Sequence, residues 1–351
     1  MTLPPLFSRL RTIQSHLRTT IVTTTTIAKM AYSTNTSRYK LSHTMLRVKD
    51  PKVSIKFYSE NFGMKLIHKL HFDDVKYSLY FLAFDSPKSE SGGNHWNDRE
   101  SVLELTHNHG TEDDPDFKVA SGNSDPGRGF GHICFSVDNI QAACSHLESN
   151  SVRFQKKLSD GRMKDIAFAL DPDGYWIELI GQAGSDPEAT TTDLETYRFN
   201  HTMIRVKDVD KSLNFYRSVL GMSLLRTMEN PDSKFNLYFL GYRRPGEDGD
   251  LTREQLAGRE GLLELTWNYG TENDPNFAYH NGNTNPQGFG NVCISVDNVQ
   301  DACARFEDLG VSWRKRLNEG RVNTVAFILD PDNYWIEVMQ NGALKKSDAA
   351  P

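Results

Sequence analysis

One ten-residue stretch occurs twice in this chain of 351 residues, and it restricts the fold more than any other feature. Residues 129–138 read GFGHICFSVD and residues 288–297 read GFGNVCISVD, so the offset is 288 − 129 = 159 residues. The two copies share the glycines, the cysteine and the Ser-Val-Asp end, whereas Asn291 stands in the place of His132. A period of this length is far longer than a solenoid unit and indicates a duplicated domain.

Four further motifs repeat in the same order along the chain. They are HTMLRVKD at 43–50, returning as HTMIRVKD at 201–208; YFL at 80–82 and 238–240; LELTHN at 103–108, returning as LELTWN at 263–268; and YWIE at 175–178 and 334–337. We therefore predict two tandem domains. The predicted parts are an N-terminal extension (1–39), a first domain (40–182), a polar, turn-rich linker (183–197), a second domain (198–342) and a C-terminal tail (343–351).

Each repeat reads as two similar halves with the order βαβββ. For the first repeat we expect strands near 43–49, 65–72, 76–84, 102–107, 131–137, 152–157, 165–170 and 175–180. Pro51 marks the start of one helix, and Gly63 marks its end. Asn139 is a candidate N-cap of another helix, in which Ile140, Ala143, Cys144 and Leu147 form one apolar face. The predicted fold class is α+β, with four βαβββ modules.

Composition excludes several kinds of partner. The chain carries 46 acidic and 40 basic residues, a net charge of −6, which disfavours binding to nucleic acid or to an anionic membrane. No apolar run approaches the length of a membrane span. The four cysteines occur two per repeat at matching places, as buried core residues would, and do not suggest a disulfide framework.

The N-terminal region has an unusual composition, because the first 49 residues contain no Asp or Glu but several basic and hydroxyl residues. This is typical of a mitochondrial presequence, and an ordinary tail explains it equally well. Met30 offers a second start for a shorter product. We therefore expect a cytoplasmic location, a mitochondrial one, or both.

Glutamates interrupt four apolar strands at matching places. They are Glu104, Glu178, Glu264 and Glu337, and each faces away from its two apolar neighbours. Solvent exposure explains one such residue, but four in matched units suggest a shared partner. His43, His201 and His132 add nitrogen donors at the starts of strands. A set of nitrogen and oxygen donors would suit Zn, Ni, Co, Mn or Fe, although the pattern alone leaves the metal site and the exposed strands equally open.

The ordered motifs, over residues 40–342, strongly resemble glyoxalase I, or lactoylglutathione lyase, in its single-chain, two-domain eukaryotic form. The resemblance implies a vicinal-oxygen-chelate fold. It also implies isomerisation of the hemithioacetal of methylglyoxal and glutathione to S-D-lactoylglutathione, with glutathione as co-substrate and a divalent metal as cofactor. Zn is the leading candidate for that metal and Ni the second.

The resemblance also implies how each metal site is assembled, from the first half of one domain and the second half of the other. One implied ligand set is His201, Glu264, His132 and Glu178. The other is His43, Glu104 and Glu337, with Asn291 in the place of a histidine. Because an amide binds transition metals weakly, we predict one competent site and one impaired site.

By the same resemblance, Glu178 moves the proton, Glu337 is its counterpart and Glu264 assists. The implied substrate-binding residues are Arg205, Asn268, Arg128, Lys156 and Met163, with Arg47, Asn108 and Lys315 at the other site. Gln287 replaces Arg128 and Val322 replaces Met163 at the impaired site; Trp267, in the place of His107, belongs to the competent one. We expect a monomer, because one chain contains both domains.

Two alternatives to this function remain. One is another metalloenzyme of the same fold, such as an extradiol dioxygenase, which would use two histidines and one glutamate around iron and leave positions open for oxygen. The other is a protein that sequesters a small molecule without turnover.

Overall fold

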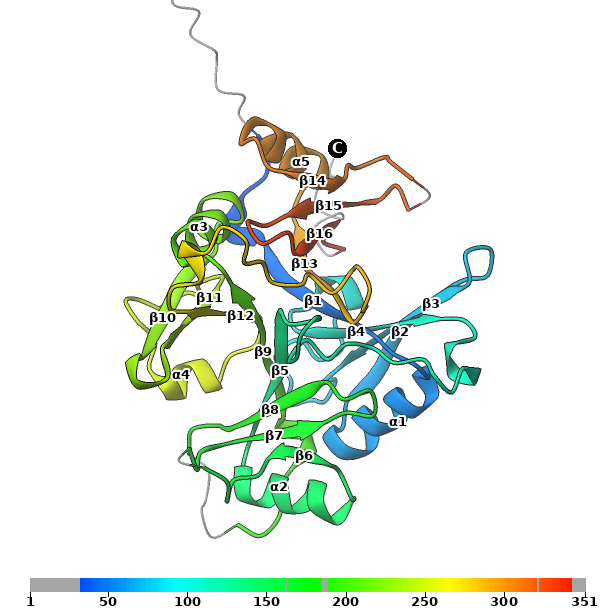
Figure 1. Ribbon diagram of the computed structural model, residues 1–351, viewed down its shortest axis with the longest axis vertical. Helices are drawn as coiled ribbons and strands as arrows, with labels where there is room; N and C mark the ends of the chain where they lie inside the picture. The colour runs from blue at the N-terminus through cyan, green and yellow to red at the C-terminus, as the bar shows by residue number, and fades with distance from the viewer. Residues whose placement is uncertain (1–31, 162, 185–188, 321, 343–351) are drawn as a thin grey trace, which may run out of the picture. The chain divides into compact units, whose positions relative to one another are not determined.

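The computed structural model describes residues 32–161, 163–184, 189–320 and 322–342 (Figure 1). The possible presequence, the alternative start at Met30, part of the linker and the C-terminal tail fall on residues 1–31, 185–188 and 343–351, which lie outside the described residues. The predictions made for these segments therefore stay predictions, as do the domain limits.

The described residues contain sixteen strands. They are β1 (Lys40–Arg47), β2 (Lys65–Phe72), β3 (Tyr77–Ala83), β4 (Val102–Asn108), β5 (Phe130–Val137), β6 (Phe154–Lys156), β7 (Ile166–Leu170), β8 (Trp176–Gly181), β9 (Arg198–Val206), β10 (Ser223–Asn230), β11 (Phe235–Gly241), β12 (Leu262–Asn268), β13 (Phe289–Val296), β14 (Trp313–Lys315), β15 (Val325–Leu329) and β16 (Trp335–Gln340). The helices are α1 (Pro51–Phe62), α2 (Ile140–Ser149), α3 (Val209–Asn214), α4 (Arg253–Ala257) and α5 (Val299–Asp308), with a π-helical turn over Phe215–Val219 after α3.

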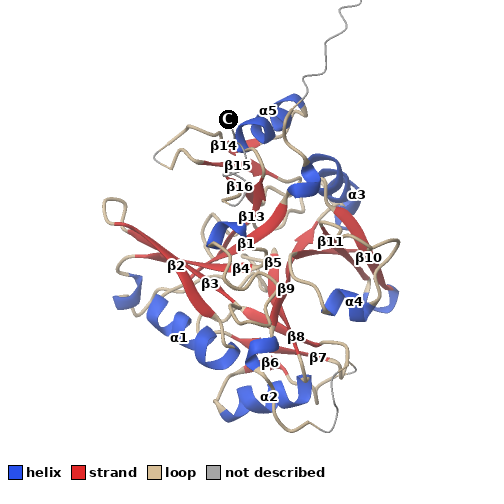
Figure 2. Ribbon diagram, turned by 180° about the vertical axis from the view of Figure 1, so that it is seen from behind, coloured by secondary structure: helices blue, strands red, loops and turns tan. Residues whose placement is uncertain are grey.

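The order of these elements is βαβββ four times, as the sequence predicts. Within each module the first strand pairs in parallel with the fourth, and the other neighbours are antiparallel. The helices pack on the sheets from outside, α1 against β4, α2 against β8 and α5 against β16 (Figure 2). The short helix α4, which precedes β12, was not predicted.

The two repeats exchange halves. One eight-stranded sheet has the order β14-β15-β16-β13-β1-β4-β3-β2, and the other has the order β10-β11-β12-β9-β5-β8-β7-β6. Each sheet therefore joins the first half of one repeat to the second half of the other, through the antiparallel pairs β1–β13 and β5–β9 (Figure 1). The arrangement agrees with the cross-domain pairing that the resemblance implies.

Local sequence explains where the predicted helices begin and end. The Asp50 side chain accepts a hydrogen bond from the Lys52 N–H, and Pro51 occupies the first turn of α1. Gly63 ends α1 in the left-handed conformation, with φ of 76°, which a glycine adopts without strain. Asn139 caps α2 by accepting a hydrogen bond from Ala142 N–H.

The glycines of the repeated ten-residue stretch are required by close contact between the repeats. A Cβ atom at Gly129 would lie 2.0 Å from the carbonyl oxygen of His280, and a Cβ atom at Gly288 would lie 1.9 Å from that of Ala120. These segments form isolated parallel bridges, Gly129 with His280 and Ala120 with Gly288. Any larger residue would force the two repeats apart at the entrance to β5 and β13.

Equivalent residues of the two repeats also meet in the core between the sheets. The Phe130 and Phe289 rings stack with their centroids 5.0 Å apart. The buried hydroxyls of Thr44 and Thr202, each next to a predicted histidine ligand, lie 2.5 Å apart. The contact between repeats is therefore pseudo-symmetric and well packed.

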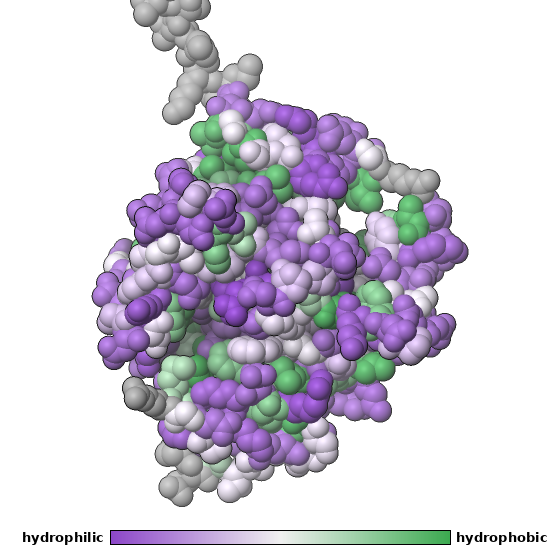
Figure 3. Space-filling view, in the orientation of Figure 1, coloured by the Kyte–Doolittle hydropathy of each residue, from purple (hydrophilic) through white to green (hydrophobic). Residues whose placement is uncertain are grey.

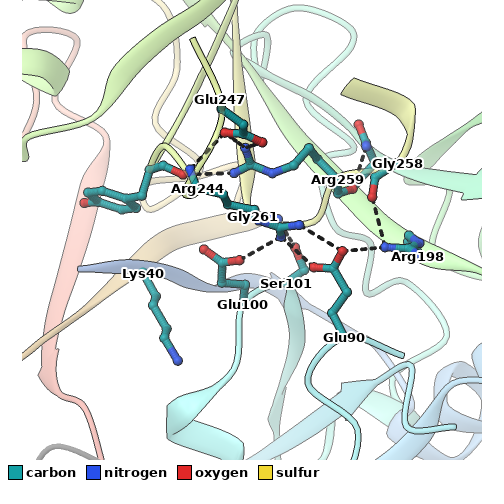
Figure 4. A network of polar contacts seen from close by, with 12 residues as sticks. Lys40, Glu90, Glu100, Ser101, Arg198, Arg244, Glu247, Gly258, Arg259 and Gly261 are labelled. Atoms are coloured by element: carbon teal, nitrogen blue, oxygen red, sulfur yellow. Dashed lines mark hydrogen bonds and ion pairs between the residues drawn. The ribbon is translucent and has the colours of Figure 1, made fainter. Parts of the chain in front are cut away.

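A network of charged residues lies at the edge of this contact (Figure 4). Arg244 forms a two-pronged ion pair with Glu90, at 2.6 and 2.8 Å, and lies 3.3 Å from Glu100. Arg198 also contacts Glu90, at 2.6 Å. Glu260, the repeat equivalent of Glu100, is 4% exposed and has no hydrogen bond or ion pair with another described residue. Burial, with repulsion from Glu90, raises the pKa of Glu260 to about 8.

The face drawn in Figure 3 is dominated by hydrophilic residues, and hydrophobic residues form small separate groups among the described part of the chain. Among the described residues, no helix combines the length and apolar character needed to cross a membrane. All four cysteines are free and buried, as predicted.

Candidate metal centre

Four neighbouring strands each contribute one side chain to a compact polar cluster. In the order of the sheet they are Glu264 on β12, His201 on β9, His132 on β5 and Glu178 on β8. The flanking residues Ile177 and Leu179 are fully buried on the opposite face of β8, so Glu178 points away from the hydrophobic core. We call this cluster the first site.

The distances within the first site match those expected around one ion. The His201 Nε2 atom lies 3.2 Å from His132 Nε2, 3.2 Å from a Glu178 oxygen and 3.1 Å from a Glu264 oxygen. His132 Nε2 lies 3.3 Å from the same Glu178 oxygen. Ligand atoms about 2.1 Å from a divalent ion stand about 3.0 Å apart in octahedral and about 3.4 Å apart in tetrahedral coordination. Two imidazoles and two carboxylates are therefore spaced to hold one divalent metal ion.

The second site has the same positions in the other sheet, Glu104 on β4, His43 on β1, Asn291 on β13 and Glu337 on β16. His43 Nε2 lies 3.0 Å from Glu104 and 3.3 Å from Glu337. Asn291 donates its side-chain N–H to Glu337 at 3.2 Å. Where the first site has the His132 nitrogen, the second site thus has the Asn291 amide, whose N–H is hydrogen-bonded to the Glu337 carboxylate.

Electrostatics distinguish the groups that can act in the first site. Burial would raise the pKa of Glu178, but His132 and His201 beside it lower the pKa below its ordinary value. Glu178 is therefore ionised at neutral pH. Cys134 lies next to the cluster, and burial raises the pKa of its thiol to about 12, so it stays protonated. Burial likewise raises the pKa of the Cys293 thiol to about 12, and this thiol lies close enough to His43 and Glu337 to be a further possible ligand of the second site.

Two arginines predicted to bind substrate hold loops of the opposite repeat. Arg205 donates through Nη1 to the carbonyl oxygens of Gly122, Gly129 and Phe130, and through Nη2 to Asn123 Oδ1 at 2.9 Å. Arg47 makes the equivalent four contacts with residues 282–289. Each guanidinium therefore lies where the chain enters β5 or β13. Most of its N–H groups already donate to the protein.

The remaining predicted substrate residues differ between the two repeats. Asn268 donates to the Tyr279 hydroxyl at 2.9 Å, whereas Asn108 is exposed and Val119 stands in the place of Tyr279. Arg128 is half-exposed and lies 3.8 Å from Asp125. Tyr279 is 7% exposed and lies near both Arg205 and Arg128.

The two predicted lysines bind backbone rather than pointing freely into a site. Lys156 donates to the carbonyl oxygens of Met163 and Ile166, both at 2.7 Å, and Lys315 donates to those of Val322 and Val325. Met163 itself is 52% exposed. These contacts close the loops that follow β6 and β14.

The replacement of His107 by Trp267 preserves one hydrogen bond. Trp267 Nε1–H donates to Glu272 at 2.9 Å, and His107 Nε2 lies 2.6 Å from the equivalent Glu112. Both rings therefore hold the turn after their strand.

Sequence reasoning missed two polar residues beside the first site, Asn200 and Tyr279. Asn200 contacts the outer nitrogen of His201 at 2.8 Å. Both were detectable by aligning the repeats, because Ser42 and Val119 occupy the equivalent positions. The roles of all site residues stay predictions.

Comparisons with known proteins identify the family of this chain. The Glyoxalase/Bleomycin resistance protein/Dioxygenase superfamily matches twice, over residues 40–179 and 198–338. A lactoylglutathione lyase of Schizosaccharomyces pombe is 52% identical, over 89% of this chain and 99% of the relative. Glyoxalase I of Saccharomyces cerevisiae is 52% identical, over 87% of this chain and 93% of the relative.

A solved structure extends the agreement to the fold. The crystal structure of glyoxalase I from Zea mays superimposes with a TM-score of 0.63 at 29% identity, over 88% of this chain and 95% of that one. The predicted fold class and resemblance are thus confirmed. The chain belongs to the glyoxalase/bleomycin resistance protein/dioxygenase superfamily and, within it, to the lactoylglutathione lyases, also named glyoxalase I.

Proposed function

We propose that this protein isomerises the hemithioacetal of methylglyoxal and glutathione to S-D-lactoylglutathione, and that the first site performs the reaction. Identity of 52% with lactoylglutathione lyases along most of the chain supports the reaction. The convergence of His132, Glu178, His201 and Glu264 from four adjacent strands supports the assignment of the site.

The four side chains of the first site would hold a divalent ion, Zn or Ni. Once bound, such an ion supplies Lewis-acid stabilisation of the negative charge that develops on the substrate oxygens. Two histidines and two carboxylates carry no soft ligand, which favours Zn or Ni over a copper or iron–sulfur centre. Glutathione would enter as part of the substrate.

Glu178 would transfer the proton. Its lowered pKa leaves a carboxylate that can take the hydrogen of C1 as a proton. The same group would then return that proton to C2 while the proton of the C1 hydroxyl passes to the C2 oxygen, so that the C1 hydroxyl becomes the thioester carbonyl and the adjacent ketone becomes an alcohol. No net oxidation occurs, and burial of Glu178 keeps the proton from exchanging freely with water. Glu264 would assist from the other side.

Residues from both repeats would bind the glutathione portion. We assign the γ-glutamyl end to Arg205 and Asn268, and the glycyl carboxylate to Arg128 and Lys156, with Met163 beside them. The bonds of Arg205 to residues 122–130, the segment that carries Arg128, would bring these groups to one entrance. Since each sheet is completed within one chain, we also propose a monomer.

Turnover of methylglyoxal tests this proposal. Metal-free protein is loaded with zinc or nickel, and thioester formation is followed with and without glutathione. We expect activity only with both metal and glutathione, and D-lactate after hydrolysis of the product. Glu178→Gln should lower kcat by about a hundredfold or more, because it removes the base but keeps the shape. Glu337→Gln is the matched control and should change kcat less than about twofold. Absence of turnover in loaded wild type would overturn the proposal.

A further inference from the structure

The two histidines at equivalent positions of the sites differ in the contacts of their outer ring nitrogen. His201 Nδ1 lies 2.8 Å from Asn200 Oδ1. His43 Nδ1 is buried and has no hydrogen-bond partner among the described residues. Ser42, in the place of Asn200, has a buried hydroxyl that is also without a partner among them. The residue before the histidine therefore supports the ring in one repeat only.

The orientation of Asn200 fixes which atom faces His201. Its side-chain N–H groups donate to the carbonyl oxygens of Leu256, in α4, and Arg259, both at 2.7 Å. With the amide nitrogen committed to two acceptors, Oδ1 must face the imidazole. An amide oxygen only accepts, so His201 Nδ1 carries the hydrogen. In the neutral ring, which carries one N–H, the lone pair of Nε2 is then directed at the centre of the first site.

Carboxylates face Nε2 in both sites, but only His201 has an acceptor at Nδ1, so the second site lacks this constraint. His43 Nε2 faces oxygens of Glu104 and Glu337 at 3.0 and 3.3 Å, and both are acceptors. Nothing described accepts a hydrogen from Nδ1. A neutral imidazole there satisfies more contacts with its hydrogen on Nε2, where it blocks the lone pair that a metal needs. Cys134 and Cys293 lie beside the two histidines at equivalent positions and do not account for the difference.

We propose that Asn200 is a positioning residue that holds His201 in its metal-binding tautomer, and that Ser42 leaves His43 in the other tautomer. One chain is thereby built to bind one metal tightly and a second one weakly. The inference rests on the proposed metal site but not on the proposed substrate, since it concerns only how each histidine is prepared. Partners that orient a metal-binding histidine in this way typically change metal affinity by 10–100-fold.

The tautomers can be observed directly in the wild-type protein. Metal-free protein with ¹⁵N-labelled histidine is studied by NMR at mildly alkaline pH, with His201→Gln and His43→Gln used to assign the signals. We expect the hydrogen of His201 on Nδ1 and that of His43 on Nε2. The same protonation pattern on both rings would overturn the inference.

Reciprocal exchange of the two supporting residues tests the consequence for metal binding. Zinc is titrated into metal-free protein against a coloured chelator that competes for it. Asn200→Ser should weaken the tight site by roughly 10–100-fold, and Ser42→Asn should tighten the weak site several-fold. Asn61→Ser, a buried asparagine in α1 away from both sites, is the matched control and should leave both affinities unchanged.

Unchanged zinc affinity in Asn200→Ser, with a melting temperature like that of wild type, would overturn the inference. If that variant does not fold, the NMR measurement on wild type and the affinity of Ser42→Asn decide instead. Tight zinc binding without turnover of methylglyoxal would overturn the proposed function while leaving this inference intact.

Discussion

The first and second sites are built from the same four motifs on the same four neighbouring strands, yet they differ in the contacts around those motifs. His132 faces Glu178 in the first site, where Asn291 donates to Glu337 in the second. Asn200 forms a hydrogen bond with His201. Ser42 forms none with His43, and its own hydroxyl has no partner among the described residues. Duplication thus preserved the strand register that gathers the ligands.

The strand register that forms the two sites can therefore be kept while the metal ligands change. Strand pairing in both sheets is set by the hydrophobic faces and by the glycine contacts between repeats, which do not depend on the ligands. A single histidine-to-asparagine difference at a buried position leaves the fold in place, because Asn291 finds a hydrogen-bond partner there. The second site can therefore lose metal chemistry without losing structure.

Removal of one histidine from each site is expected to have the largest effect. His201→Ala deletes a ligand of the first site and should lower kcat/KM for the glutathione hemithioacetal by more than about a hundredfold. His43→Ala should change it by less than about twofold, since the second site already lacks a ligand. Steady-state kinetics with zinc supplied measures both. Equal losses would mean that both sites turn over, and a loss only in His43→Ala would mean that the pairing of halves is wrong.

The buried glutamates Glu100 and Glu260 extend the comparison to the contact between repeats. Burial raises the pKa of both carboxyl groups, but Glu100 lies 3.3 Å from Arg244, whereas Glu260 has no ion-pair partner among the described residues and its pKa reaches about 8. A carboxyl group whose pKa is raised in the folded state costs stability where only the unfolded state is ionised. Stability should therefore fall between about pH 4.5 and pH 8 and level off above that range.

Glu260→Gln removes this cost and should raise the free energy of unfolding by about 1–3 kcal/mol at pH 7, with little gain at pH 4.5. Chemical denaturation at several pH values measures the difference. Glu100→Gln is the matched control: burial raises the pKa of Glu100 as well, but its contact with Arg244 offsets part of that cost, so this variant should gain less stability than Glu260→Gln. A gain for Glu260→Gln that does not depend on pH would contradict the explanation.

A smaller effect is expected at Tyr279, which lies beside Asn268 in the first site and has Val119 as its counterpart in the second. Burial raises the pKa of Tyr279, so its hydroxyl stays protonated and can accept from Asn268 while donating to a ligand. Tyr279→Phe should raise KM about three- to tenfold, with kcat within about twofold of wild type. Kinetics with glutathione adducts measures this split.

Tyr269→Phe provides the control for Tyr279, because it also removes a tyrosine hydroxyl bonded to an asparagine, Asn236, at 2.7 Å. Its KM should match that of wild type. In an Asn268→Ala background, Tyr279→Phe should have no further effect if the hydroxyl acts through the amide. Additive losses would instead assign Tyr279 an independent contact with the substrate.

Most of the fold was predictable because its signals are local. Pro51, Gly63 and Asn139 mark helix ends by themselves, and the alternation around Glu178 sets one face of a strand. The exchange of halves between repeats follows from strand pairing across 62 or more residues, as for Ser136 and Arg198, and came from the resemblance alone. Helix α4 was missed because five residues form too short a periodic pattern.

The candidate site was predictable where residues repeat and harder to predict where they differ. Motifs shared by both copies identified the histidines and glutamates, and the one conspicuous exception, Asn291, identified the weaker set. Asn200 was not found because its role depends on Leu256 and Arg259, which lie 56 and 59 residues away in the chain. Such contacts leave no periodic signal in a sequence.

The smallest effect on turnover, and the sharpest test of the comparison, is expected from Asn291→His. The variant restores an imidazole beside Glu337 and removes the amide that donates to it. If Asn291 alone disables the second site, zinc stoichiometry should rise from one to two tightly bound ions, and kcat should rise at most about twofold. Ser42→Asn together with Asn291→His should then bring the second site close to the first. The single variant could bind a second ion while kcat stays at the wild-type value. In that case the second site lacks substrate binding for a reason other than the metal, namely that Val119, Gln287 and Val322 replace the Tyr, Arg and Met of the first site.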